Sequence, residues 1–122
     1  MNEKTTILYV DDEPFNLLLF KRLFKDRYDV MTSESGLEGM EVLRSENTIK
    51  AVISDLKMPS MDGIEFVTKA KKEFPNVAFF LLTGFDCTPE ITEILEKKII
   101  FNYFGKPLNI NHITSSIEKS LV

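Results

Sequence analysis

The chain has 122 residues, a formal net charge of −4, 28% charged residues and a single cysteine, Cys87. This composition excludes a disordered chain, and the length fits one domain, either a whole protein or a single-domain piece of one. The acidic balance argues against a basic surface for direct contact with nucleic acid. One cysteine excludes an internal disulfide and favours a reducing compartment, and no apolar run is long enough for membrane insertion, so we expect a single cytoplasmic domain.

Strand and helix patterns alternate along the whole chain. Continuous apolar runs predict strands, and apolar residues three or four positions apart predict helices. In chain order the predicted elements are the strand Thr5–Val10, the helix Pro14–Phe24, the strand Tyr28–Thr32, the helix Gly36–Arg44, the strand Ala51–Ser54, the helix Gly63–Phe74, the strand Val77–Leu82, the helix Pro89–Lys97, the strand Ile99–Phe104 and the helix Ile110–Leu121.

Five strand–helix pairs predict an α/β fold. Strands without polar alternation are typical of burial on both faces, so helices should cover both sides of a parallel sheet. Right-handed crossovers with one reversal of winding give a doubly wound, five-stranded parallel sheet of order 2-1-3-4-5, the flavodoxin-like (βα)5 arrangement. The first and third strands then flank the switch point, where such folds place their sites.

Polar residues gather where the predicted strands end. Asp11 and Asp12 follow the first strand, and Asp55 ends the third. Thr83 ends the fourth strand, and Lys106 follows the fifth, so all these residues should meet at one edge of the sheet. Carboxylates brought together require a cation, and ligands that are all oxygen suit Mg²⁺. A carboxylate nucleophile, a metal, a hydroxyl and an ammonium group together predict aspartyl-phosphate chemistry.

Each of these features has a plainer interpretation when taken alone. The aspartates after the first strand would serve equally well as caps of the helix that follows. Thr83 would fit an ordinary turn, and Lys106 would fit an exposed surface position. The pair Asp62-Gly63 is interpreted as a turn and a helix cap rather than as part of a site.

Four short segments carry a more specific signal. They are "LYVDDE", "VISDLKMPSMDG", "LLTG" and "YFGKP", in this order along the chain. Together they resemble the receiver domains of two-component response regulators, and the resemblance spans essentially all of residues 1–122. It implies a signalling domain, not an enzyme with a separate substrate, that accepts a phosphoryl group from a histidine kinase or a histidine phosphotransfer protein. A homodimer linked to phosphorylation is a further expectation.

The resemblance implies a metal-binding and phosphoacceptor site. Asp55 would be the phosphoacceptor and a metal ligand. Asp12 would bind Mg²⁺ or Mn²⁺ directly, and Asp11 would orient a water molecule on the metal. The backbone carbonyl of Lys57 would be a further ligand.

The resemblance also implies residues that bind the phosphoryl group and transmit its presence. Thr83 and Lys106 would bind phosphoryl oxygens, and a cis peptide bond before Pro107 would direct the lysine inward. Thr83 and Tyr103 would form a switch that reshapes the face made by the fourth helix, the fifth strand and the fifth helix.

Two residues depart from polar residues often found in the family, and we expect them to tune the rate of dephosphorylation. Lys57 lies two positions after the acceptor, and Phe85 lies two positions after the threonine. Neither is a general base at neutral pH, so we expect slow hydrolysis. The alternative is that both side chains point to solvent.

The helix Pro14–Phe24 has more apolar residues than one buried face needs. Its core side is predicted to hold Leu19, Phe20, Leu23 and Phe24. The surplus residues are Phe15, Leu17 and Leu18. They either pack under loops or face solvent beside Asp55, where a helical partner that carries the donor histidine would dock.

Three other functions share parts of this pattern. An FMN-binding protein of the same topology would need a phosphate-binding loop where Asp11 and Asp12 would repel phosphate. A haloacid-dehalogenase-type phosphatase places its nucleophile after the first strand in an Asp-x-Asp pattern that is absent here. The main alternative is a pseudo-receiver that binds partners without phosphorylation, although all five polar residues of the site are present.

Overall fold

The computed structural model describes residues 4–84 and 87–122, in which strands and helices alternate from one end to the other. The strands are β1 (Thr5–Val10), β2 (Tyr28–Ser33), β3 (Ile49–Asp55), β4 (Ala78–Thr83) and β5 (Asn102–Gly105). The helices are α1 (Pro14–Phe24), α2 (Gly36–Ser45), α3 (Gly63–Glu73), α4 (Pro89–Glu96) and α5 (Ile110–Ser120). Every predicted element is present, with ends that differ by a few residues at most. Among the described residues, none of the helices combines the length and apolar character needed to span a membrane.

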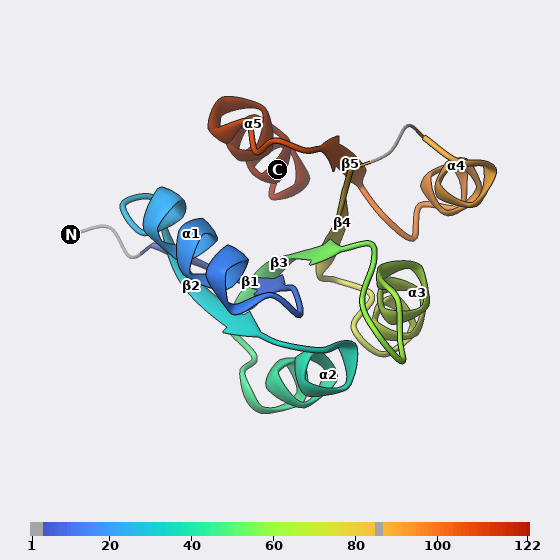
Figure 1. The fold of residues 1–122 in the computed structure, drawn as a ribbon, viewed down its shortest axis with the longest axis horizontal. Coiled ribbons are helices and arrows are strands. Elements are labelled where there is room, and N and C mark those ends of the chain that lie inside the picture. The colour runs from blue at the N-terminus through green and yellow to red at the C-terminus, as the bar shows by residue number, and fades with distance from the viewer. Residues whose placement is uncertain (1–3, 85–86) are drawn as a thin grey trace.

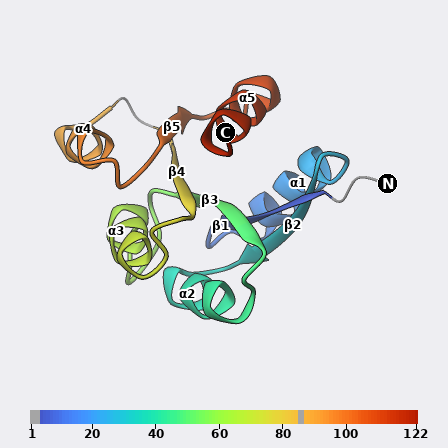
Figure 2. The ribbon, with the colours of Figure 1, turned by 180° about the vertical axis from the view of Figure 1, so that it is seen from behind.

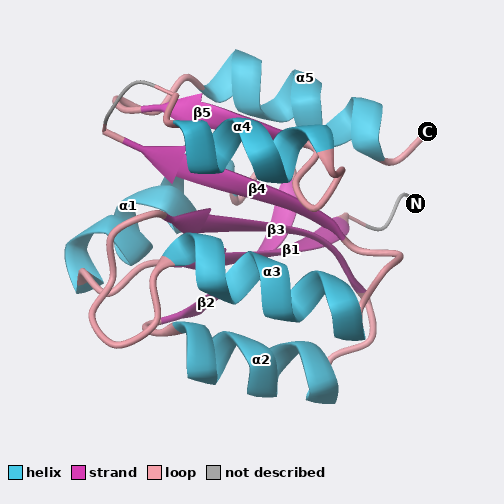
Figure 3. Cartoon of the chain, turned by 90° about the vertical axis from the view of Figure 1, so that its right-hand side faces the viewer, coloured by secondary structure: helices cyan, strands magenta, loops and turns pink. Residues whose placement is uncertain are grey.

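All neighbouring strands pair in parallel, and their order across the sheet is β2-β1-β3-β4-β5. Helices α1 and α5 lie on one face, whereas α2, α3 and α4 lie on the other (Figure 1; Figure 2). Figure 3 shows the second group in front of the strands. The predicted doubly wound α/β fold is therefore confirmed.

The sheet separates two hydrophobic clusters because consecutive residues of a strand point to opposite faces. In β1, Leu8 and Val10 join the cluster under α2, α3 and α4. Ile7 and Tyr9 join the cluster under α1 and α5. All four side chains are at most 1% exposed, which explains why this strand is apolar without alternation.

The start of α3 is fixed by a cap and by a close backbone contact. The carboxylate of Asp62 accepts a hydrogen bond from the backbone N–H of Glu65 at 2.9 Å, which confirms its interpretation as a cap. A Cβ at Gly63 would collide with the backbone carbonyl oxygen of Asp55. Glycine at this position therefore lets the first turn of α3 lie against the end of β3.

The predicted core side of α1 is correct at two positions and wrong at two. Phe20 and Phe24 are fully buried, and their rings stack with centroids 4.4 Å apart. Leu19 and Leu23 are each 38% exposed, whereas Leu17, predicted as surplus, packs against the core. Successive residues of a helix point about 100° apart around its axis. Because Phe20 and Phe24 point into the core, Leu19 and Leu23, which precede them, point partly toward solvent.

Candidate functional site

Three carboxylates meet at the carboxyl end of the sheet. Asp11 and Asp12 follow β1 directly, and Asp55 is the last residue of β3. The two strands are neighbours in which Val10 lies opposite Ser54, so the residues that follow are brought side by side. One carboxylate oxygen of each aspartate lies within 4.8 Å of the others. The clustering predicted from the strand ends is confirmed.

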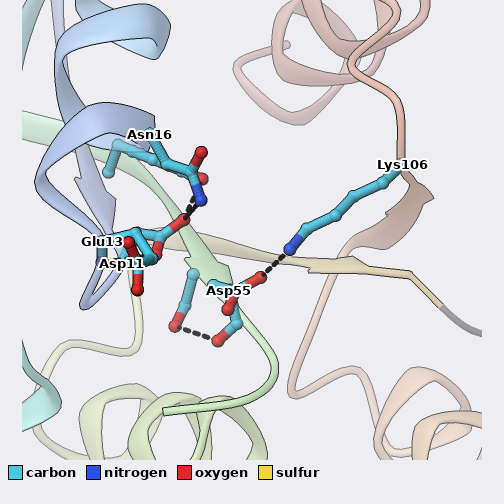
Figure 4. A network of polar contacts seen from close by, with 7 residues as sticks. Asp11, Glu13, Asn16, Asp55 and Lys106 are labelled. Carbon is cyan, nitrogen blue, oxygen red and sulfur yellow. Dashed lines mark hydrogen bonds and ion pairs between the residues drawn. The ribbon is translucent and has the colours of Figure 1, made fainter.

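A lysine approaches this acidic cluster from the end of β5. Lys106 Nζ lies 2.8 Å from Asp55 Oδ1, and the aspartate side chain is only 7% exposed (Figure 4). The backbone N–H of Lys106 donates to the carbonyl oxygen of Thr83 at 2.8 Å, which holds the ends of β4 and β5 together. The peptide bond between Lys106 and Pro107 is cis. Lys106 is therefore an exposed residue, at 41%, whose ammonium group is directed to the buried Asp55.

Thr83 and Tyr103 lie on the two strands beyond the acceptor. Leu82 is the register partner of Asp55, so Thr83 is one position further along β4, and it is 1% exposed. Tyr103 is paired with Leu81 and is half-buried against the cluster under α2, α3 and α4. The geometry brings Thr83 to the same edge as the aspartates and puts Tyr103 one strand away, against the cluster under α2, α3 and α4.

Of the two residues predicted to tune the rate of dephosphorylation, the structure describes Lys57 alone. Lys57 is exposed and follows Asp55 by two positions in the loop after β3. Phe85 lies outside the described residues, so its orientation stays a prediction.

The electrostatics of the site favour binding of a further cation. Burial raises the pKa of the Asp55 carboxyl, and the negative charges of Asp11 and Asp12 raise it further. The hydrogen bond and the charge of Lys106 oppose this shift but do not cancel it, so the net direction is upward. The three aspartates offer only carboxylate oxygens, which are ligands that suit a hard ion such as Mg²⁺. The residues present therefore fit a magnesium site.

The groups that hold Asp11 in place were not predicted from the sequence. The Tyr9 hydroxyl donates to Asp11 Oδ2 at 2.7 Å, and Asn16 Nδ2 donates to the same oxygen at 3.2 Å. The backbone N–H of Glu13 donates to Asp11 Oδ1 at 3.0 Å, and Glu13, the N-cap residue of α1, makes no side-chain capping hydrogen bond. The alternation of side chains along a strand could have indicated the contact with Tyr9, because residues two positions apart, such as Tyr9 and Asp11, point to the same face of a sheet.

Burial also reinforces the protonated state that a tyrosine has at neutral pH. Burial raises the pKa of Tyr9, and the hydrogen bond to Asp11 and the nearby negative charges of Asp11 and Asp55 raise it further. The Tyr9 hydroxyl is therefore protonated at neutral pH and acts as a donor.

A groove of about 330 Å³ lies beside the site, between α1 and the loop that precedes α5. It is lined by Tyr9, Asn16, Leu19, Leu23, Leu82, Lys106, Pro107 and Leu108. On the surface of α1, Phe15 and Leu18 are 70% and 55% exposed. The surplus apolar residues at these two positions therefore face solvent, as one of the two alternatives predicted.

Comparisons with known proteins agree with this geometry. The sequence model of the response regulator receiver domain matches residues 7–118. The chain is 34% identical over 116 residues to the transcriptional regulatory protein GlrR of Escherichia coli. This match covers 94% of this chain but only 26% of the length of GlrR. It is 32% identical over 124 residues to sporulation initiation phosphotransferase F of Bacillus subtilis, which covers 99% of this chain and 95% of that protein. A solved receiver domain from Clostridium thermocellum has a TM-score of 0.88 at 30% identity, over 95% of this chain and 93% of that one.

Proposed function

Because the chain belongs to the receiver-domain family of response regulators, we propose that it is the phosphoacceptor of a two-component pathway and that Asp55 accepts the phosphoryl group. The observation that carries this proposal is the surroundings of Asp55. Its buried carboxylate lies beside two other carboxylates within 4.8 Å, and an ammonium group lies 2.8 Å away. This combination supports a nucleophile that is surrounded by groups able to bind a metal and a phosphoryl group.

The proposed reaction transfers a phosphoryl group from a phosphohistidine. An oxygen of Asp55 attacks phosphorus, the bond between phosphorus and the histidine nitrogen breaks, and the electron pair stays on the imidazole. Lys106 moves from Asp55 to a phosphoryl oxygen, and the Thr83 hydroxyl donates to another. Mg²⁺ held by Asp11, Asp12, Asp55 and the Lys57 carbonyl would neutralise charge on the transferred group.

We further propose that phosphorylation is transmitted through Thr83 and Tyr103. The buried position of Thr83 at the sheet edge and the half-buried position of Tyr103 against the cluster under α2, α3 and α4 support this assignment. Movement of Thr83 toward the phosphoryl group would let Tyr103 rotate inward and reshape the face made by α4, β5 and α5. The phosphoryl group then acts by favouring one of two conformations that already exchange.

The exposed apolar surface of α1 supports a partner that brings the donor histidine. Leu19 and Leu23 of α1 line the groove together with Lys106, and Phe15 and Leu18 are exposed on the same helix. A helix from a histidine kinase or phosphotransfer protein would cover this surface and hold its histidine near Asp55. We place this exchange in the cytoplasm, within one receiver domain of residues 1–122, and expect any phosphorylation-linked homodimer to use the α4-β5-α5 face.

The decisive experiment is chemical phosphorylation followed by intact mass measurement. Acetyl phosphate or phosphoramidate with Mg²⁺ should add one phosphoryl group to the wild type and none to Asp55→Asn. The matched control is Asp62→Asn, because Asp62 is an exposed helix cap, and this variant should be labelled like the wild type. Labelling of Asp55→Asn to the wild-type level would contradict the assignment, and a wild type that is never labelled would favour the pseudo-receiver.

A further inference from the structure

Tyr9 is a buried aromatic residue that carries a polar group into the core beside the proposed metal site. Its side chain is 1% exposed, and its ring stacks on Phe20 with a centroid distance of 4.1 Å and an interplanar angle of 4°. The stacking fixes the plane of the ring, and the hydroxyl reaches Asp11 Oδ2 at 2.7 Å. A phenylalanine would fill the same space, so packing alone does not require the hydroxyl.

The hydrogen bonds to Asp11 are distributed unevenly between its two oxygens. Among the described residues, Oδ2 accepts from the Tyr9 hydroxyl and from Asn16 Nδ2, whereas Oδ1 accepts from the backbone N–H of Glu13. A carboxylate has about four lone-pair positions, two on each oxygen. Oδ2 is therefore filled, and the remaining position lies on Oδ1.

The three donors to Asp11 among the residues that the structure describes are also uncharged. A tyrosine hydroxyl, a side-chain amide and a backbone N–H orient a carboxylate without neutralising it, whereas Lys106 brings a positive charge to Asp55. Asp11 is fully buried, and these donors hold its carboxylate in one orientation. Hydrogen bonds of this kind are typical of the residues that orient a metal ligand without binding the metal themselves.

We infer that Tyr9 and Asn16 are positioning residues for the metal site, which fill Oδ2 of Asp11 so that Oδ1 is presented to the ion or to a water molecule on it. The inference rests on the proposed function, because it assigns the groups that support the proposed magnesium site. It predicts that the affinity for Mg²⁺ depends on a hydroxyl that does not itself bind the metal.

The chain offers a matched control for this hydroxyl. Tyr28 is also buried, at 3% exposure, and its hydroxyl donates to Glu118 Oε2 at 2.6 Å. Tyr28 pairs with Thr5 at the beginning of β1, at the opposite end of the strand from Asp11. Tyr9→Phe and Tyr28→Phe therefore remove the same group from the same kind of bond, and only one of these bonds lies at the proposed metal site.

The experiment measures Mg²⁺ affinity at equilibrium by calorimetry or by amide chemical shifts, together with thermal unfolding in EDTA. Tyr9→Phe should weaken Mg²⁺ binding by about tenfold, the lower end of the range for groups that support metal ligands. Tyr28→Phe should bind Mg²⁺ like the wild type even where it unfolds at a lower temperature. In phosphorylation with acetyl phosphate, Tyr9→Phe should raise the Mg²⁺ concentration for half the maximal rate more than it lowers the rate at saturating Mg²⁺.

The outcomes separate this inference from the proposed function. Wild-type Mg²⁺ affinity in Tyr9→Phe, or an equal loss in Tyr28→Phe, would overturn the positioning role while phosphorylation of the wild type leaves the proposed function intact. A wild type that neither binds Mg²⁺ nor accepts a phosphoryl group would overturn both. If Tyr9→Phe does not fold, Asn16→Ala removes the second donor to Oδ2 from a half-buried position, and unchanged affinity there would overturn the inference.

Discussion

Two ion pairs of nearly equal length lie in contrasting parts of this molecule. Arg44 on α2 and Glu73 on α3 are joined at 2.7 Å, with both side chains well exposed. Lys106 and Asp55 are joined at 2.8 Å, with the aspartate almost fully buried. The hydrogen bond from Arg44 lowers the pKa of Glu73, whereas the pKa of Asp55 is raised despite its lysine.

The difference shows that distance alone does not decide whether an ion pair satisfies a carboxylate. Around Glu73 the surrounding water keeps the cost of charge small, and a bidentate guanidinium favours the charged form. Around Asp55, burial and the charges of Asp11 and Asp12 outweigh one ammonium group. In the Arg44–Glu73 pair the two charges balance each other. At the sheet edge, Lys106 balances only one of three aspartates, and a divalent cation would balance the remaining negative charge.

The largest expected effect comes from removing a carboxylate at the sheet edge. Asp12→Ala should lower the affinity for Mg²⁺ by at least about tenfold, and phosphorylation should fall with it. The fold should keep or gain stability, because repulsion with Asp55 is relieved. Calorimetry with Mg²⁺ and thermal unfolding test both statements, and Glu73→Ala is the control that should leave Mg²⁺ binding unchanged. Wild-type affinity in Asp12→Ala would mean that the metal binds elsewhere.

The second effect concerns how long Asp55 would retain a phosphoryl group. Hydrolysis requires a water molecule in line with the scissile bond, and neither Lys57 nor Phe85 can deprotonate it at neutral pH. We expect a phosphorylated lifetime of minutes or longer. Lys57→Asn combined with Phe85→Glu should speed hydrolysis by roughly tenfold, which corresponds to ~1.4 kcal/mol in the barrier.

Time courses of intact mass after removal of the phosphodonor measure this rate. Lys50→Asn is the control, because Lys50 is an exposed lysine at the other end of β3 and should not affect the rate. Loss of the phosphoryl group from the wild type within seconds would show that these two residues do not set the lifetime.

The third effect is a dependence of folding stability on pH, which should have opposite signs for the carboxylates of Asp55 and Glu73. The raised pKa of Asp55 means that its charge destabilises the fold, and this penalty develops as pH rises from the unfolded pKa to the folded pKa. Asp55→Asn should therefore be more stable than the wild type at neutral pH, by a few degrees in Tm, and the gain should vanish in acid.

Glu73 should show the reverse. Because its pKa is lowered in the fold, it contributes stability above the unfolded pKa and loses that contribution as pH falls through the folded pKa. Glu73→Gln should therefore destabilise at neutral pH and have no effect in acid. Denaturant unfolding of both variants across this pH range tests the signs, and curves of equal sign would remove the contrast between the two pairs.

The smallest expected effect is a change of population across the sheet. Beryllofluoride with Mg²⁺ mimics the phosphoryl group, and its addition should shift amide NMR signals at Tyr103 and in α5 as well as around Asp55. A preference of a few kcal/mol for one conformation is enough for such a shift. Signals that change only in the loops next to Asp55 would argue against the proposed switch, and Arg44, far from the site, should report no change.

The part of this site that could be predicted from the sequence is the part fixed by strand ends. Asp11, Asp55 and Lys106 each follow or end an apolar run, and parallel strands bring such positions to one edge. The support from Tyr9 could not be predicted in the same way, because a hydrogen bond depends on where a ring is held and not only on which face it occupies. The error at Leu19 has the same origin, since the rotation of a helix about its axis is set by packing.

The parallel sheet itself has a consequence for how such a domain diverges after gene duplication. Leu19 and Leu23 lie on the α1 side of the sheet, whereas Tyr103 packs on the side of α3 and α4. On our proposal, substitutions that alter the choice of partner at α1 would leave Tyr103 and α4 on the opposite layer untouched, whereas α5 shares the α1 layer. A lineage that acquired such a new input would inherit α4 and Tyr103 unchanged, and α5 would be the one helix of the proposed output face that shares a layer with the altered surface.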